Sequence, residues 1–218
     1  MTMTAAYAVP RSFYVEVARR TSLLRSAWFS LRFRGIVLVG RGARVRVHRR
    51  ASVRIARGGM LVLGLTHDSA PGAVLRMQPR SVLEVSGRVQ VMRSSSITVG
   101  YDATLAVGAG TFLNDGASIV CHDHVTIGRD CAISWGVRIL DTDVHELVRD
   151  GVGGARHRPV VLGDRCWLGA GAMVLKGVTL GDDTVVGAGS VVTADGTDGQ
   201  LLVGSPARVV ATGVTWRP

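Results

Sequence analysis

The sequence predicts an all-β chain wound into a parallel β-helix, and two observations carry this prediction. Large aliphatic residues recur at every sixth position over long stretches, and small residues occupy a fixed place between them. Aromatic residues make up only 5% of the chain, which contains 28 glycines. The core must therefore be built from aliphatic side chains on short strands that tight turns connect.

The repeat is clearest from Leu162 onward. Its aliphatic positions are Leu162, Leu168, Val174, Leu180, Val186 and Val192, and the small residues that follow are Cys166, Ala172, Val178, Thr184 and Ser190. The same pattern occurs upstream at Val107, Leu113 and Ile119 with Thr111 and Ala117, and at Ile127, Ile133 and Ile139 with Cys131 and Val137. Leu63-Gly64 and Val99-Gly100 are weaker copies. So long a run in constant register indicates a true internal repeat.

A period of six suits neither an α-helix nor a single amphipathic strand. It suits one short strand followed by one corner, and three such units close a triangular coil of roughly 18 residues. We expect the aliphatic side chains and the small residues, Cys131 and Cys166 among them, to point into the prism. Glycine follows four of the aliphatics, at Gly163, Gly169, Gly181 and Gly187. We expect these glycines to turn the corners with positive φ.

Three regions follow from where the repeat holds. Residues 36–200 form the β-helix, residues 1–35 a basic amphipathic helical segment, and residues 201–218 an extension that folds back over one end. Val17, Leu24, Trp28 and Leu31 share one helical face of the first segment. That face either lies on a membrane or caps the open end of the prism.

Charge is distributed unevenly along the chain. Residues 1–93 hold 17 Arg and 3 acidic residues, whereas residues 94–218 hold 9 basic and 13 acidic residues. The asymmetry indicates an anionic partner for the first half, such as a phospholipid surface or a phosphorylated glycolipid, or else a composition that simply favours arginine, since Lys176 is the only lysine. No helix-turn-helix, zinc-finger or aromatic-basic motif points to nucleic acid.

The sequence shows no membrane-spanning run of apolar residues and no signal-peptide order at its start. Cys121, Cys131 and Cys166 form neither a CxxC pair nor a disulfide framework. We therefore expect a cytoplasmic protein, with peripheral contact at the inner face of the membrane if the basic half binds lipid.

The repeat is interrupted decisively at residues 141–159, a polar, Gly-rich segment within ILDTDVHELVRDGVGGARHRPVV. An excursion from a rigid scaffold is a common place for function. This segment, FLNDGASIV before it, and GDRCWLGAGAMVLKGVTLGDDTVVGAGSVVT with VGSPARVV after it resemble hexapeptide-repeat O-acetyltransferases. The resemblance covers residues 99–210. The family that it points to includes galactoside and maltose acetyltransferases and the sugar acetyltransferases of polysaccharide pathways.

The resemblance implies a left-handed coil, a homotrimer with active sites between subunits, and acetyl transfer from acetyl-CoA, a cosubstrate, to a hydroxyl. It implies no permanently bound cofactor or metal. We expect a sugar hydroxyl of a polysaccharide or glycolipid as acceptor, with a small natural product or antibiotic as the alternative. A non-catalytic scaffold or membrane module remains open. A γ-type carbonic anhydrase remains open as well, although the HxxxxH spacing of that family is absent.

Transfer to a hydroxyl requires a base, because an alkoxide is scarce at neutral pH, and imidazole suits this role. His145 is the candidate base. Asp141 and Asp143 lie close to it in sequence, and either could orient the ring, although Asp141 could equally brace the loop. Asn114 matches a family residue on the acceptor side, and together with Asp141 and Asp143 it forms the predicted acceptor-binding set.

The tetrahedral oxyanion needs preorganised N–H donors, and the amides near Gly169 and Ala170 are the candidates. The resemblance points to Ala170, Ala188, Thr193 and Arg208 as CoA-binding residues, and the predicted set also includes Gly169. Arg208 suits the role of a phosphate partner. Relatives carry Lys after the matching Thr, where this chain has Ala194, and DGTDGQ replaces a proline-rich turn. Phosphate contacts then fall to Lys176 or to a neighbouring subunit's arginine.

Three other residues are left without an assigned role. His122 replaces a carboxylate that sugar-specific relatives often carry, which leaves the choice of acceptor open. His157 is expected to be a loop residue, and Trp167 is expected to pack at the rim rather than to bind substrate.

Overall fold

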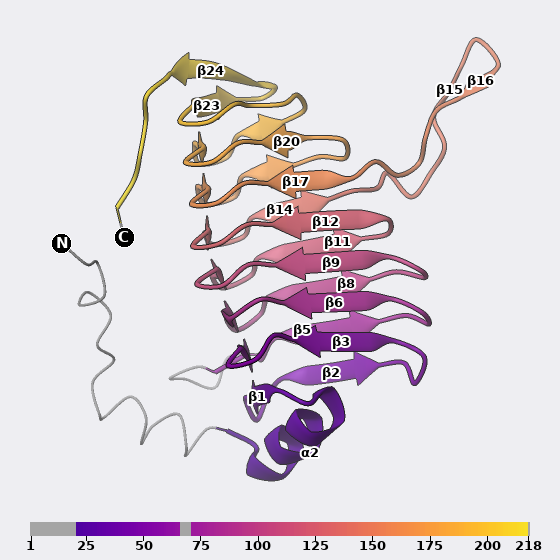
Figure 1. The fold of residues 1–218 in the computed structure, drawn as a ribbon. Helices are drawn as coiled ribbons and strands as arrows, with labels where there is room; N and C mark the ends of the chain where they lie inside the picture. Colours follow the sequence, from indigo (N-terminus) through magenta and orange to yellow (C-terminus); the bar gives the residue numbers. More distant parts are fainter. Residues whose placement is uncertain (1–20, 66–70, 218) are drawn as a thin grey trace.

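The computed structural model describes residues 21–65 and 71–217, and these wind into a parallel β-helix with three flat faces (Figure 1). Within the described residues, sheet I has nine strands: β1 (Ile36–Val39), β4 (Met60–Leu63), β7 (Arg88–Val91), β10 (Phe112–Leu113), β13 (Ala132–Ile133), β18 (Trp167–Leu168), β21 (Val185–Val186), β23 (Leu201–Gly204) and β24 (Ala207–Ala211). Only the β23–β24 pair of this sheet is antiparallel.

The other two faces are parallel throughout. In the described part of the chain, sheet II has seven strands: β2 (Arg44–Val47), β5 (Val74–Met77), β8 (Ser96–Val99), β11 (Ser118–Cys121), β14 (Arg138–Leu140), β19 (Met173–Val174) and β22 (Val191–Val192). Sheet III has six: β3 (Ser52–Ile55), β6 (Val82–Val85), β9 (Thr104–Val107), β12 (His124–Ile127), β17 (Val160–Leu162) and β20 (Thr179–Leu180). Each coil passes from sheet I to II to III, so the prism has a I–II, a II–III and a III–I edge.

The six-residue repeat supplies the side chains of the core, as predicted. Leu162, Leu168 and Val174 lie on β17, β18 and β19, which are the three faces of the prism. All twelve aliphatic positions of the repeat blocks are at most 2% exposed. Ile119 is in register with Ile97 on one neighbouring strand and Ile139 on the other, so identical side chains stack from coil to coil.

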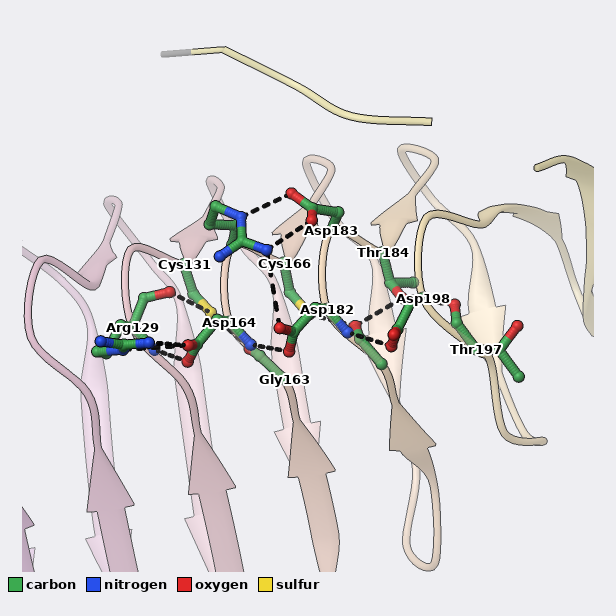
Figure 2. A network of polar contacts seen from close by, with 12 residues as sticks. Arg129, Cys131, Gly163, Asp164, Cys166, Asp182, Asp183, Thr184, Thr197 and Asp198 are labelled. Atoms are coloured by element: carbon green, nitrogen blue, oxygen red, sulfur yellow. Dashed lines mark hydrogen bonds and ion pairs between the residues drawn. The ribbon is translucent and has the colours of Figure 1, made fainter. Parts of the chain in front are cut away.

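The small positions are buried as well, because they point inward where the corners narrow the prism. At the III–I edge their side chains also bond to backbone. Cys131 Sγ contacts the Gly163 carbonyl at 3.2 Å (both residues are labelled in Figure 2), and Cys166 Sγ contacts the Gly181 carbonyl at 3.3 Å. Thr184 Oγ1 donates to that same Gly181 carbonyl at 2.8 Å. The cysteines are therefore core residues, as expected.

The prediction that the glycines after the aliphatics have positive φ is wrong. Gly163, Gly169, Gly181 and Gly187 are absent from the positive-φ residues. Glycine occupies these positions for another reason. A Cβ on Gly163 would lie 2.7 Å from the backbone nitrogen of Asp182, and one on Gly181 would lie 2.6 Å from the backbone nitrogen of Asp198. These positions require glycine because neighbouring coils approach too closely for a side chain.

A ladder of aspartates ties the coils together along the III–I edge (Figure 2). Asp164 Oδ1 accepts from the Arg129 backbone N–H at 2.7 Å, and Asp182 Oδ1 accepts from the Asp164 N–H at 2.8 Å. Asp198 continues the ladder to Asp182 at 2.9 Å. Each carboxylate thus satisfies a corner N–H of the preceding coil that the sheets leave free.

Helix α2 (Leu23–Phe33) lies against the first coil, at the end opposite β24 (Figure 1). Phe29 and Phe33 are buried in the core cluster, and Ser26 Oγ accepts from the Val39 N–H at 2.9 Å. Of the two alternatives for the apolar helical face, capping of the prism is therefore excluded for its described residues. Leu24, Trp28 and Leu31 face outward, and Val17 lies outside the described residues.

The last described residues fold back toward the prism. β23 pairs with β21, the chain reverses into β24, and Trp216 Nε1 donates to the Arg165 carbonyl at 2.5 Å. The rings of Trp216 and Trp167 lie 6.0 Å apart. Trp167 thus packs beside the tail with 41% of its surface exposed.

We expect Arg165→Gln to destabilise the protein at neutral pH and to have a vanishing effect in acid. Arg165 donates two hydrogen bonds to Asp183 (2.8 and 2.6 Å), and its side chain holds the Asp183 pKa below the ordinary value. A carboxyl whose folded pKa is lowered contributes stability above its unfolded pKa of about 3.9 and loses that stability as pH falls through the folded pKa. Urea unfolding of the wild type and the variant, from neutral pH down into acid, measures the difference in their free energies of unfolding. A difference that does not change with pH would contradict a stabilising role for the Arg165–Asp183 pair.

Candidate functional site

The excursion leaves the prism at the II–III edge, between β14 and β17. It projects as a two-stranded hairpin, β15 (Val148–Arg149) and β16 (Val152–Gly153), well beyond the body of the prism (Figure 1). Leu147, Val148 and Val152 on this hairpin are 59–74% exposed.

Asp141 fixes the start of the excursion. Its carboxylate is fully buried, and its two oxygens accept from the backbone N–H groups of His122 and Asp123, each at 2.7 Å. Both oxygens therefore brace the corner of the coil below. This geometry favours the bracing role that the sequence left open for Asp141 over direct orientation of His145.

Thr142 and His157 close the base of the excursion. The two residues form an antiparallel bridge, and the Thr142 hydroxyl lies 2.7 Å from His157 Nδ1. The His157 ring lies 5.7 Å from the ring of His122 on the coil below. His122 and His157, which sequence reasoning left without roles, thus meet beside the loop.

Asp143 and Lys176 hold the next segment. The Asp143 carboxylate pairs with Lys176 Nζ at 2.5 Å, and the same ammonium donates to the Ala155 carbonyl at 2.5 Å. The Asp143 N–H donates to the Arg156 carbonyl at 3.0 Å. Lys176 is thus engaged in fixing the loop, and the structure gives no sign that it is available for a CoA phosphate.

His145 follows directly and is exposed. Its N–H donates to the Asp143 carbonyl at 2.6 Å across Val144, whose φ is +62°. This tight three-residue turn is rare, and a β-branched residue at positive φ is strained. The Val144 N–H is bonded to Thr142 Oγ1 at 2.8 Å, which holds the turn in place. Strain of this kind concentrates at functional positions. Sequence reasoning missed it because valine gives no signal of such a turn.

The predicted CoA residues lie mainly on a different edge. Gly169, Ala170 and Ala188 occupy the I–II edge, one coil above another. The backbone N–H groups of Ala170 and Ala188 have no hydrogen-bond partner within the described part of the chain, whereas the Ala170 carbonyl accepts from Gly189 at 2.8 Å. These two amides are therefore available to a ligand.

The remaining predicted residues are dispersed. Asn114 is half-buried on the I–II edge, where its backbone carbonyl accepts a hydrogen bond from Ser95 Oγ at 2.7 Å. Thr193 is exposed on the II–III edge above His145. Arg208 lies on β24, opposite Val203. Trp135, also on the I–II edge and 60% exposed, was not singled out from the sequence.

One chain therefore carries two separated parts of the predicted site. His145, Asp143 and Thr193 lie on the II–III edge, whereas Asn114, Gly169, Ala170 and Ala188 lie on the I–II edge. Sheet II separates the edges, and its strands of two to four residues span about 7–13 Å. Residues 141–159 do not bridge that distance, since they project away from the prism (Figure 1).

The described residues hold no group of three or more His, Cys, Asp or Glu side chains arranged to bind a metal ion. Burial raises the pKa of the Cys121 thiol, and the nearby Asp141 carboxylate adds to this effect. Cys121 is thus kept neutral and unreactive.

Comparison with known proteins places these features in context. A family model described as "Hexapeptide repeat of succinyl-transferase" matches residues 159–194. Nodulation protein L of Rhizobium meliloti is 43% identical over 110 residues, which cover 50% of this chain and 60% of that protein. A polysialic acid O-acetyltransferase of Neisseria meningitidis is 29% identical over 79 residues, covering 35% of this chain and 37% of that protein. The chain thus spans about 60% of the length of the nodulation protein.

Solved structures share the fold over a larger region. The polysialic acid O-acetyltransferase OatWY superposes with a TM-score of 0.61 at 20% identity, covering 81% of this chain and 88% of the other. The polysialic acid-specific acetyltransferase NeuO gives a TM-score of 0.55 at 20% identity, covering 83% and 84%. The shared fold confirms the left-handed parallel coil. The repeat, the stacked core and this likeness together show a left-handed parallel β-helix, and residues 159–194 match the hexapeptide-repeat model.

Proposed function

We propose that the chain is an acyl-CoA-dependent O-acyltransferase that moves an acetyl group from acetyl-CoA to a hydroxyl of a sugar-containing acceptor. The observation that carries this proposal is the presentation of His145. An exposed imidazole stands on a strained turn at Val144, in a loop that Asp141, Thr142 and Asp143 anchor to the prism. Supporting contacts of this kind are typical of side chains that must be held in position for function.

The chemistry follows from these groups. The acceptor hydroxyl oxygen attacks the thioester carbonyl carbon while His145 takes the hydroxyl proton. The carbonyl oxygen becomes an oxyanion, for which the free N–H of Ala170 is the proposed donor. When the tetrahedral intermediate collapses, the C–S bond breaks and the imidazolium returns the proton to the departing CoA thiolate. The products are the acetyl ester and CoA.

The other predicted residues take supporting roles. Gly169, Ala170 and Ala188 form the proposed floor for the pantetheine arm, because a flat edge with free amides admits an extended chain. Thr193 and Arg208 are the proposed contacts toward the nucleotide end. Asp143 and Asn114 are proposed on the acceptor side, with Asp141 as the positioning residue beneath the loop.

We infer that the working unit is a homotrimer. The proposed base lies on the II–III edge and the proposed oxyanion donor on the I–II edge of the same chain, so a cleft between two copies is the simplest way to unite them. The exposed aliphatic residues of the β15–β16 hairpin supply a contact for the neighbour.

The acceptor class is inferred from the acceptors that the names of similar proteins specify. The names of two structural neighbours and one relative specify polysialic acid, a sugar polymer, as the acceptor of those proteins. A small natural product or antibiotic is the alternative acceptor. A panel of mono-, oligo- and polysaccharides beside small hydroxylated natural products, assayed by CoA release, separates the two classes.

We expect His145→Ala to lower kcat by roughly 10²–10⁴-fold, the typical contribution of a general base, while CoA binding is retained. CoA-thiol release measures turnover, and isothermal titration calorimetry with CoA measures binding. Glu146→Ala, an exposed neighbour on the same loop, serves as the control and should retain activity. Unchanged turnover in the His145 variant would remove this residue from the mechanism.

We expect two inactive variants to restore activity in mixed trimers. His145→Ala lacks the base on the II–III edge, and Ala170→Trp blocks the I–II edge. If each site uses both edges from different subunits, random co-assembly of equal amounts leaves about a quarter of the sites intact. Refolding the mixture together and assaying it against each variant alone measures this. A mixture that is as inactive as its parents, with trimers shown to have mixed, would place both groups in one chain.

We also propose peripheral contact of α2 with an anionic bilayer. Leu23, Leu24, Trp28 and Leu31 are 54–88% exposed on the side of the helix away from the prism. Arg25, Arg32 and Arg34 flank them, and the mixture of apolar and cationic side chains is complementary to anionic lipid. No helix in the described part of the chain is long and apolar enough to span a membrane.

We expect Leu24→Gln/Leu31→Gln to reduce sedimentation with vesicles of phosphatidylcholine and phosphatidylserine by about 10-fold, because two large apolar contacts are lost. Val209→Gln/Val210→Gln, which removes two exposed aliphatic residues from β24 at the opposite end of the prism, is the matched control. Equal binding of the wild type and the helix variant would contradict membrane contact through α2.

A further inference from the structure

A shallow cavity of about 350 Å³ lies low on sheet II, where β2 and β5 reach the II–III edge. Its lining consists of Arg46, Val47, His48, Arg76, Met77 and Gln78. The lining therefore carries two arginines and a histidine but no carboxylate. The proposed transfer chemistry uses none of these residues.

The two arginines are placed against each other. Arg46 and Arg76 are directly opposite in the register of β2 and β5, and both are exposed on the outer face of the sheet. Like charges opposite each other on neighbouring strands are destabilising. Neither guanidinium has a carboxylate partner within the described residues, whereas Arg80, on the next corner, is paired with Asp102 through two hydrogen bonds of 2.5 Å. The unpaired charge at Arg46 and Arg76 is what an anionic ligand would neutralise.

His48 adds a directed donor to the pair. Its Nδ1 accepts from the Arg50 backbone N–H at 3.1 Å. A neutral imidazole that accepts at Nδ1 carries its proton on Nε2, so the other ring nitrogen is a donor. Two guanidinium forks and an imidazole N–H around one cavity match the oxygen atoms of a carboxylate or a phosphate.

The cavity lies on the same edge as His145. From β14, which leads into the His145 loop, sheet II continues through β11 and β8 to β5 and then β2. At about 4.8 Å per strand, Arg76 is roughly 14 Å and Arg46 roughly 19 Å below the base of the loop. Tyr101 follows β8, on the corner between the cavity and the base of the His145 loop. Its ring is 62% exposed and is amphipathic, of the kind that packs against sugars.

We propose that Arg46, Arg76 and His48 form a binding subsite for an acidic group on an extended acceptor, such as a carboxylate or phosphate of a glycan chain. The acceptor runs along the II–III edge from this subsite past Tyr101 to His145. A single neutral sugar reaches only the transfer end, so the preferred substrate is an anionic glycan of several units. This inference rests on the proposed acyl transfer and specifies its substrate class.

Binding can be tested without turnover. The probes are pentagalacturonate, mannopentaose phosphate and neutral maltopentaose, titrated calorimetrically into the full-length protein. We expect one or both acidic probes to bind, and Arg46→Gln/Arg76→Gln to weaken that binding at least about 10-fold. Arg57→Gln/Arg88→Gln removes the same charge from exposed arginines on the III–I edge and sheet I, and should leave binding unchanged. Equal affinity for the neutral probe, or equal losses in both double variants, would overturn the subsite.

Turnover then connects the subsite to the transfer site. For the acidic acceptor that binds, Arg46→Gln/Arg76→Gln should raise KM about 10-fold with kcat nearly unchanged, since the subsite contributes equally to ground-state and transition-state binding. Activity on a small neutral acceptor should be retained, which also shows that the variant is folded. If the wild type acetylates small acceptors but the variant keeps its KM for acidic ones, the subsite is wrong and the transferase remains. If no acceptor is acetylated and CoA does not bind, the proposed function fails instead.

Discussion

The close stacking of one coil on the next is the constraint on which the rest of this structure depends. Each aliphatic side chain of the repeat is buried only because an equivalent residue lies above and below it, as Ile119 does between Ile97 and Ile139. No coil can bury its own interior, so stability is a property of neighbours. The approach is so close that Gly163 and Gly181 have no space for a side chain. The aspartate ladder at the III–I edge follows from the same packing, since corner N–H groups must find acceptors in the adjacent coil.

A scaffold this rigid leaves few places for functional groups, and the II–III edge is the place where the chain departs from it. The departure is anchored firmly at its base: a buried carboxylate at Asp141 binds two amides of the coil below, and the strained turn at Val144 is held by Thr142. Hydrogen bonds of this kind position a loop residue more accurately than an unsupported loop can. Among the described residues, the outer part of the hairpin, β15 and β16, makes no comparable hydrogen bond to the prism.

The repeat could be predicted almost entirely from the sequence, because a six-residue spacing of aliphatics has one physical solution. The location of the excursion followed for the same reason: a sequence that breaks the spacing cannot stay in the wall. Features that depend on which coil lies next to which could not be predicted. The His122–His157 contact joins residues 35 positions apart, and the opposed Arg46 and Arg76 become neighbours only through strand register. The sequence left open whether the apolar face of α2 caps the prism or lies on a membrane, because its pattern does not show that Phe29 and Phe33, rather than Leu24 and Leu31, reach the core.

The uneven charge of the chain has a structural counterpart. In the C-terminal half, arginines along the III–I edge are neutralised in pairs, Arg129 with Asp164 and Arg165 with Asp183. In the N-terminal half, Arg46 and Arg76 have no such partners among the described residues. A composition that merely favoured arginine would not explain why Arg80 on the adjacent corner is paired with Asp102 whereas the opposed Arg46 and Arg76 are not. The excess positive charge lies below the His145 loop, on the edge where that loop begins, and this is where an acidic acceptor would have to lie to reach the base.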